Sequence, residues 1–336
     1  MVQENNMTEK FSNIRTGVIG IGSMGQNHAR VYSEISNFIG VADPDENKGR
    51  ALASKFGVEW FRDFKDLIGL VDAVSIATPT KYHSEIAIEF ASKGVNILVE
   101  KPLADSIVNS EKIIKAASKA NVVLSVGHIE RHNPVVRFMK DNLVQNKLGD
   151  LISLSARRLS LYPERILDVG VIFDLLVHDI DIMNYIFDKP PVSIYSLGHN
   201  FKNGNNEDSA ITILDYGDGH TGICETSWLS PIKVRKMQVL TSNNLALLDF
   251  MNQSIDFSSS NFLDLDKSDL SNYAMEMNTR TLNLAKEEPL KNELMDFLQA
   301  IHKSVSPLVS GDAGSLMVKI AEASIKSIET GKVIRL

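Results

Sequence analysis

Apolar residues between residues 13 and 130 fall in short runs that alternate with longer segments of helical period. The runs RTGVIG, FIGVAD, VDAVSIAT, VNILVE and NVVLSVGH are rich in β-branched residues and predict strands. Between them, KYHSEIAIEFASKG spaces its apolar residues four apart, as at Ile86 and Phe90, and predicts a helix that ends at Gly94. This alternation is typical of a doubly wound parallel sheet, which binds ligands beyond the carboxyl ends of its strands.

After residue 130 the pattern changes to longer alternating runs joined by tight turns. LISLSARRLSL, PVSIYSLGHNF, SAITILDYGDGHTGICETSWL, IKVRKMQVLT and LALLDFM predict the hairpins of an antiparallel sheet. Two helical patterns follow, at residues 287–305 and 313–332, and the Ser/Asp-rich stretch from Ile255 to Ser271 predicts irregular structure. An antiparallel sheet leaves one face free unless helices cover it, so we expect a homodimer or homotetramer that assembles through this face.

Composition narrows the class of protein. A chain of 336 residues suggests two domains, and a net charge of -7 argues against a general nucleic-acid or anionic-membrane binder. The single cysteine, Cys224, cannot form an intramolecular disulfide, and no apolar run approaches the roughly 20 residues of a membrane helix. We therefore expect a cytoplasmic protein. The polar first twelve residues, MVQENNMTEKFS, predict a disordered tail.

The first predicted strand leads into a glycine-rich motif. Gly20, Gly22 and Gly25 have the G-x-G-x-x-G spacing directly before a helical pattern, which suits a dinucleotide pyrophosphate at a helix N-terminus. The second strand ends in Asp43, where a carboxylate can accept hydrogen bonds from ribose hydroxyls and would repel a 2'-phosphate. These residues predict NAD rather than NADP as the cofactor. The alternative for Asp43 is a turn residue before Pro44.

A charged pair, Glu100-Lys101, stands between an apolar run and Pro102 in the stretch LVEKPLADS. It lies at the carboxyl end of a predicted parallel strand, where such sheets bind ligands. The pair is therefore either a salt-bridged strand terminus or part of a site.

The second half contains GVIFDLLVHDIDIMNYI, a helical pattern with Asp174, His178 and Asp181 on one face. Three explanations are open for titratable groups on a mostly apolar helix. They can be hydrogen-bonded where the helix packs on the nucleotide domain, they can bind a metal, or they can catalyse. A histidine with a pKa near neutrality can take the proton of an alcohol whose hydride leaves for nicotinamide.

GIGSMG, EKP and D-x-x-x-H occur in that order, and from about Ile14 to the C-terminus the chain resembles the glucose-fructose oxidoreductase, inositol dehydrogenase and rhizopine catabolism family. The resemblance implies a Rossmann domain (13–130) and a substrate-binding and oligomerisation domain (131–336) with an open-faced, mainly antiparallel sheet. It implies NAD(P)-dependent oxidation or reduction of sugar or cyclitol hydroxyls. It assigns Lys101 and His178 as catalytic residues, with Asp174 as an orienting or substrate-binding partner. Glu100 would then hold the Lys101 ammonium and Pro102, with a peptide bond that could be cis, would fix the bend.

The predicted site has two parts and no metal. The predicted cofactor-binding residues are Gly20, Gly22, Ser23, Met24, Gly25, Asp43, Thr78, Pro79, His83, Glu100 and Lys101. The predicted substrate-binding residues are Arg131, Asn133, Arg157, Arg158, Arg165, Asp174 and His178.

Within the family, the segment ARRLSLYPERILDVGVIFDLLVHDIDI is most similar to enzymes that oxidise C3 of UDP-N-acetylglucosamine. Arg157, Arg158 and Arg165 cluster there in an acidic protein, and guanidinium groups suit a diphosphate. The alternatives are a solvated strand edge for the arginines, loop capping for Arg131 and Asn133, and a free sugar or inositol as substrate. A non-catalytic sensor of NAD or of a sugar nucleotide is the alternative from another class of function.

Overall fold

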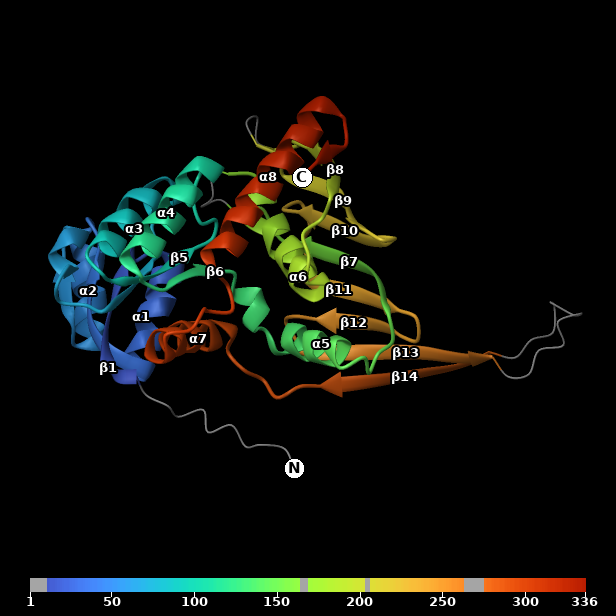
Figure 1. The fold of residues 1–336 in the computed structure, drawn as a ribbon, viewed down its shortest axis with the longest axis horizontal. Coiled ribbons are helices and arrows are strands. Elements are labelled where there is room, and N and C mark those ends of the chain that lie inside the picture. The colour runs from blue at the N-terminus through green and yellow to red at the C-terminus, as the bar shows by residue number, and fades with distance from the viewer. Residues whose placement is uncertain (1–10, 164–168, 203–205, 263–274) are drawn as a thin grey trace, which may run out of the picture. The chain divides into compact units, whose positions relative to one another are not determined.

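The structure, a computed structural model, describes residues 11–163, 169–202, 206–262 and 275–336, which form two compact units (Figure 1). The first unit combines the chain up to Ile129 with Glu288–Lys319, and the second combines Glu130–Glu287 with Ile320–Leu336. The predicted domain limits differ from these units at Glu288–Lys319, which groups with the first unit. The physical reason is the apolar side of one helix, Pro289–Lys303, whose Leu294 and Phe297 are buried in the same core as Tyr32.

The first unit contains a parallel sheet of six strands in the order β3-β2-β1-β4-β5-β6. This is the strand order of a Rossmann fold, which confirms the predicted fold class. The strands are β1 (Phe11–Ile19), β2 (Ser36–Ala42), β3 (Glu59–Phe61), β4 (Ala73–Ile76), β5 (Asn96–Glu100) and β6 (Leu124–Gly127).

Two apolar cores form where helices pack on this sheet (Figure 1). One core joins Ile86 and Phe90 of α3 to Ile113 of α4, and the other joins Tyr32 of α1 to Leu294 of α7. The α-helices of this unit are α1 (Ser23–Ile35), α2 (Glu46–Phe56), α3 (His83–Ser92), α4 (Ile107–Ala120), α7 (Pro289–Lys303) and the first part of α8 (Gly311–Thr330). Short 3-10 helices are η1 (Phe64–Leu67), η2 (Thr80–Tyr82) and η3 (Ile129–His132), the last of which crosses into the second unit.

The predicted tail is too long by two residues. β1 begins at Phe11, which pairs with Ser36 of β2 and is buried in the core beside α1. An aromatic side chain gains enough from burial to extend the strand into a polar stretch. The first ten residues of the predicted tail lie outside the described residues.

The second unit contains a sheet of nine strands in the order β14-β13-β12-β11-β7-β10-β9-β8-β15. All its pairings are antiparallel except that of β7 with β10, so the predicted mainly antiparallel sheet is confirmed. The strands are β7 (Leu151–Leu159), β8 (Ser193–His199), β9 (Ser209–Gly217), β10 (His220–Ser227), β11 (Val234–Thr241), β12 (Leu245–Asp249), β13 (Ser254–Phe262), β14 (Met275–Asn283) and β15 (Ile334–Arg335).

The prediction of irregular structure from Ile255 to Ser271 is wrong for its first part, because β13 pairs with both β12 and β14. Pairing on both sides satisfies the backbone of this serine-rich strand, so the fold overrides its weak strand propensity. The rest of the stretch lies outside the described residues.

Helices cover one face of this second sheet. On that face, Met183 of α6 (Val177–Phe187) contacts the thiol of Cys224 in β10, and Phe138 of α5 (Pro134–Val144) contacts Phe257 in β13. The other face carries exposed apolar side chains, including Ile211 and Ile213 of β9, which are 50% and 46% exposed. None of the described helices is long and apolar enough to span a bilayer.

Candidate active site

The glycine-rich turn has the backbone geometry that its spacing predicts. Gly20 has a φ of 81°, and a Cβ there would lie 2.7 Å from the carbonyl oxygen of Ala77. A Cβ at Gly25 would overlap the carbonyl oxygen of Gly20. Both positions therefore require glycine, because a side chain at Gly20 would collide with the backbone after β4 and one at Gly25 would collide with the turn itself.

The N-terminus of α1 fits the pyrophosphate of a dinucleotide. Gly22 and Ser23 are exposed, Met24 is half-buried, and a Cβ at Gly22 would meet nothing within 4 Å. No side chain caps the helix at this end, and its first turn carries no acidic residue. The first N–H groups of a helix need acceptors, and a pyrophosphate can supply them where no carboxylate competes.

Asp43, after the end of β2, is half-buried and shapes the turn there. Its Oδ2 accepts from Ile21 N–H at 2.9 Å, and its Oδ1 accepts from Asp45 N–H at 2.8 Å. Each carboxylate oxygen can accept two hydrogen bonds, so each keeps capacity for a ribose hydroxyl. The turn role and the ribose role, which the sequence presents as alternatives, are thus compatible.

The loop after β4 holds the next predicted cofactor residues. Thr78 is half-buried and Pro79 is exposed. The Thr78 hydroxyl oxygen is buried and has no hydrogen-bond partner among the described residues. His83 is different, because its ring is buried and its two nitrogens lie 3.0 Å from Pro102 O and 2.9 Å from Thr78 O. Burial lowers the His83 pKa, and we assign this residue to positioning the ends of β4 and β5 instead of to direct cofactor contact.

Glu100 and Lys101 stand at the carboxyl end of β5, and the Lys101–Pro102 peptide is cis. The Glu100 carboxylate accepts from the backbone N–H of Lys101 at 3.2 Å and lies 2.9 Å from Nε2 of the buried His28. Burial opposes ionisation of Glu100, but contacts with His28 and the charge of Lys101 outweigh it and lower its pKa. Glu100 is therefore an ionised, buried group that fixes the backbone of the half-buried Lys101.

Glu293 of α7 is a buried acid that the sequence did not single out. Neither of its carboxyl oxygens has a hydrogen-bond partner among the described residues. Burial, together with the negative charges of Glu100 and Asp296, raises its pKa well above the usual range. The pKa values of the two buried carboxyls therefore shift in opposite directions, that of Glu293 upward and that of Glu100 downward. Glu293 lies three residues after Leu290 and four before Phe297, on the apolar side of α7. This spacing is the sequence signal of its burial.

The second unit places Asp174 and His178 at the start of the helix that the sequence predicts. Ile172–Leu176 is a π-helical turn that leads directly into α6, and π-turns occur frequently at functional sites. Asp174 and His178 are half-buried. Asp174 accepts from the Trp228 indole N–H at 3.3 Å, and Glu207 holds the turn by accepting from the backbone N–H of Ile172 at 3.1 Å.

Asp181, the third residue on this face, has a structural partner. Its carboxylate accepts from Arg131 Nη2 at 2.7 Å and from Arg131 Nε at 2.8 Å, which is a paired, fork-like geometry. Asp181 is buried, so this pair anchors α6 to the segment before α5. In the described part of the chain, no group of three or more His, Cys, Asp or Glu side chains is arranged to hold a metal.

Arg158 does not present its guanidinium to a substrate, which corrects its predicted role. It is 1% exposed, donates to Asp179 from Nε and Nη2 at 3.0 and 2.8 Å, and donates to Glu130 from Nη1 at 2.9 Å. A buried cation needs such partners. The sequence does not show that Asp179 is one of them, because the mostly apolar helix around Asp179 gives no sign of which residue it contacts.

The other predicted substrate residues also have structural partners or lie outside the described residues. Arg157 is exposed on the opposite face of β7 and pairs with Glu225, with Nε 2.6 Å from Oε2. Asn133 is buried and caps α5 by accepting from Val135 N–H at 3.3 Å. Arg165 lies outside the described residues. Loop capping, the alternative for Asn133, thus agrees with the structure.

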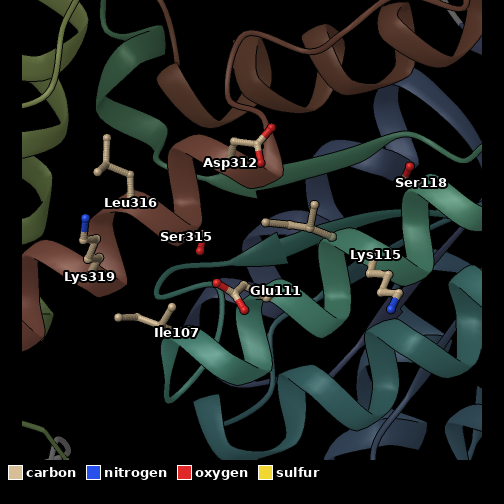
Figure 2. A pocket seen from close by; sticks show the side chains of 9 residues that line it. Ile107, Glu111, Lys115, Ser118, Asp312, Ser315, Leu316 and Lys319 are labelled. Atoms are coloured by element: carbon tan, nitrogen blue, oxygen red, sulfur yellow. The ribbon is translucent and has the colours of Figure 1, made fainter.

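The groove between α4 and α8 in Figure 2 is a separate feature, with a volume of about 420 Å³. Two acids, Glu111 and Asp312, and two bases, Lys115 and Lys319, line it. It contains none of the residues predicted to bind cofactor or substrate. The chemistry described above therefore does not lie in this groove.

Models of known protein families match segments in both units of the chain. The family model described as "Oxidoreductase family, NAD-binding Rossmann fold" matches residues 14–128, and the model of the "GFO/IDH/MocA C-terminal domain" matches residues 136–244. The UDP-N-acetylglucosamine 3-dehydrogenase of Acidithiobacillus ferrooxidans is 29% identical over 92% of this chain and 95% of its own. The myo-inositol 2-dehydrogenase of Thermotoga maritima is 24% identical over 96% of this chain and 98% of its own.

Solved structures extend the similarity. The structure of the Acidithiobacillus ferrooxidans enzyme has a TM-score of 0.84 and 28% identity, with 94% of this chain and 98% of that chain covered. Levoglucosan dehydrogenase in complex with NADH and levoglucosan shares the fold, with a TM-score of 0.81 at 19% identity over 96% of this chain and 99% of that chain. The two family models together span both units of the fold, and the chain belongs to the Gfo/Idh/MocA family of NAD-binding oxidoreductases.

Proposed function

We propose that this protein is an NAD-dependent dehydrogenase that oxidises the C3 hydroxyl of a nucleotide sugar, UDP-N-acetylglucosamine, to the 3-keto sugar. The observation that carries the proposal is the similarity to a UDP-N-acetylglucosamine 3-dehydrogenase over nearly the whole chain. The inositol dehydrogenases among the relatives support the second candidate, oxidation of a free sugar or inositol.

The proposed chemistry is a single alcohol oxidation in which three side chains take part. Bound NAD supplies the hydride acceptor. Lys101 donates a hydrogen bond to the reacting oxygen, and a neutral His178 takes the hydroxyl proton. Asp174, held by Trp228, orients His178 or a neighbouring sugar hydroxyl. The carbon loses a hydride and the oxygen loses a proton, which leaves the ketone.

A coupled assay tests this function. NADH formation is measured with UDP-N-acetylglucosamine, free N-acetylglucosamine, glucose and myo-inositol, and a trapping amine removes the ketone. The trap is needed because NAD oxidises secondary alcohols unfavourably near neutral pH. We expect turnover with UDP-N-acetylglucosamine. Turnover with free glucose or inositol alone would reject the nucleotide sugar and retain the dehydrogenase.

Asp43 should make the enzyme prefer NAD. We expect NAD to bind at least tenfold tighter than NADP, a difference of about 1.4 kcal/mol, because a 2'-phosphate would lie against the carboxylate. Asp43→Asn should reduce this preference, since the amide keeps the size of the side chain without its charge. Asp63→Asn, at another turn of the same unit, is the matched control. Titration calorimetry measures both affinities, and equal affinities in the wild type would leave Asp43 as a turn residue alone.

The exposed face of the second sheet should join subunits. Its apolar side chains, among them Ile211, Ile213 and Ile223, lie on two neighbouring strands and form a patch suited to a symmetric interface. We propose a homodimer or homotetramer through this face. Light scattering should report an oligomer for the wild type and for Val144→Glu, an exposed position on α5, and a smaller species for Ile213→Glu. A monomeric wild type would contradict the proposal.

A further inference from the structure

Several chain segments meet at one end of the second sheet. Leu159, the last residue of β7, pairs with Ser227 at the end of β10 and with Val234 at the start of β11. Tyr162 and Trp228, which follow these strand ends, contact each other edge to face at a centroid distance of 5.7 Å. Trp228 also donates to Asp174, so this end of the sheet adjoins the proposed catalytic helix within the same unit.

Arg235 lies at this end, on the face covered by helices. It pairs with Arg158 across β11 and β7, which places both side chains on the same side of the sheet. Its Nη1 is 3.7 Å from Oε1 of Glu130, the oxygen that already accepts from Arg158 at 2.9 Å. Glu130 is therefore shared, with the shorter contact going to Arg158. The Arg235 side chain is 35% exposed and so can reach a ligand.

Lys233 adds a second cation two residues before Arg235. The charge of Arg235 is the largest of the causes that lower the Lys233 pKa. Burial and the charge of Arg158 lower the pKa of Arg235, although Glu130, Asp179 and Asp174 act in the opposite direction. Both pKa shifts include repulsion from neighbouring cations, and a bound anion would reduce that repulsion.

We propose that Lys233 and Arg235 form a subsite for the diphosphate of a nucleotide-sugar substrate, beside Asp174. The inference rests on the proposed function and assigns the phosphate contacts to residues other than the arginines that the sequence suggests. Arg158 is occupied by Asp179 and Glu130, and Arg157 lies on the opposite face with Glu225. A guanidinium near the start of β11 and an ammonium just before that strand suit two phosphate groups, because the first can bind two oxygens and the second acts as a point charge.

Binding of UDP and of uridine to the NADH-loaded protein tests the subsite without catalysis. Titration calorimetry should show that the wild type binds UDP at least tenfold tighter than uridine. Lys233→Gln and Arg235→Gln should each weaken UDP binding by about tenfold to hundredfold, the range for a lost hydrogen bond to a charged group, with uridine affinity unchanged. Lys189→Gln, which removes the same charge near the β9–β10 turn, is the control and should bind UDP as the wild type does.

The outcomes separate this inference from the proposed function. Unchanged UDP affinity in folded Lys233→Gln and Arg235→Gln, or equal affinity of the wild type for UDP and uridine, overturns the subsite even if UDP-N-acetylglucosamine is oxidised. Loss of UDP binding in the variants supports the subsite even if UDP-N-acetylglucosamine is not oxidised, in which case only the proposed function fails. Lys233 is exposed, so Lys233→Gln should fold. This variant alone decides the test if Arg235→Gln does not fold.

Discussion

Replacement of Lys101 by Met or of His178 by Asn should lower kcat for sugar oxidation by about 10²- to 10⁴-fold, the usual contribution of a positioned acid or base. Lys101→Met removes the donor to the reacting oxygen, and His178→Asn removes the group that takes its proton. NAD affinity should change little, because the turn at Gly20 to Gly25 and Asp43 hold most of the cofactor contacts that we propose. Steady-state kinetics in the coupled assay and NAD titration measure the two effects separately.

Two control variants make this result specific. Lys81→Met and His199→Asn alter exposed residues of the same types, one in each unit, and should retain wild-type kcat. Full activity of His178→Asn would reject the proposed mechanism. A wild type that binds NAD and UDP-N-acetylglucosamine but turns over no sugar, and whose ligand affinities Lys101→Met leaves unchanged, would instead support a non-catalytic sensor.

The fold was predictable where the sequence carries a local signal. Five of the six strands of the parallel sheet follow from β-branched runs alternating with helical periods, and the turn at Gly20 and Gly25 follows from glycine spacing alone. The sixth, β3, has only three residues and was not predicted. The parallel pairing of β7 with β10 has no such signal, because strand partners far apart in the chain leave no local pattern. For the same reason, the helices after residue 287 follow from their period, but the grouping of α7 and the first part of α8 with the first unit does not.

The sequence indicated which residues of the candidate site are unusual, but not which of them have buried ion-pair partners. Asp174 and His178 stand out because they interrupt an apolar helix, and the structure leaves them half-buried at its start. Asp179 interrupts the same helix, yet it is buried against Arg158. Sequence spacing gives the face on which a residue lies but not the partner that neutralises it. From the sequence, the arginine cluster predicts a diphosphate site. The ion pairs of Arg158 with Glu130 and Asp179 show that this arginine has a structural role instead.

The structural role of Arg158 leads to a large expected loss of stability. Arg158→Met should lower the free energy of unfolding at pH 7 by about 3–5 kcal/mol, the usual cost of removing one partner from a buried ion pair. Asp179 and Glu130 would then remain buried without the guanidinium that now donates hydrogen bonds to both carboxylates. Arg157→Met is the matched control: its pair with Glu225 is exposed, and its loss should cost at most about 1 kcal/mol. Urea unfolding measures both changes.

The pH dependence of this loss identifies its cause. Burial opposes ionisation of Glu130, but the charge of Arg158 outweighs it and holds the Glu130 pKa below its usual range. A carboxyl with a lowered folded-state pKa stabilises the fold above its unfolded pKa of about 4.3, and that stability is lost as the pH falls through the folded value. In Arg158→Met the buried carboxyls favour their neutral forms, so the deficit relative to wild type should shrink between pH 7 and pH 5. Adding Asp179→Leu should recover part of the loss, because it removes a charge left unpaired. A raised KM for UDP-N-acetylglucosamine with unchanged stability would show instead that Arg158 binds the substrate.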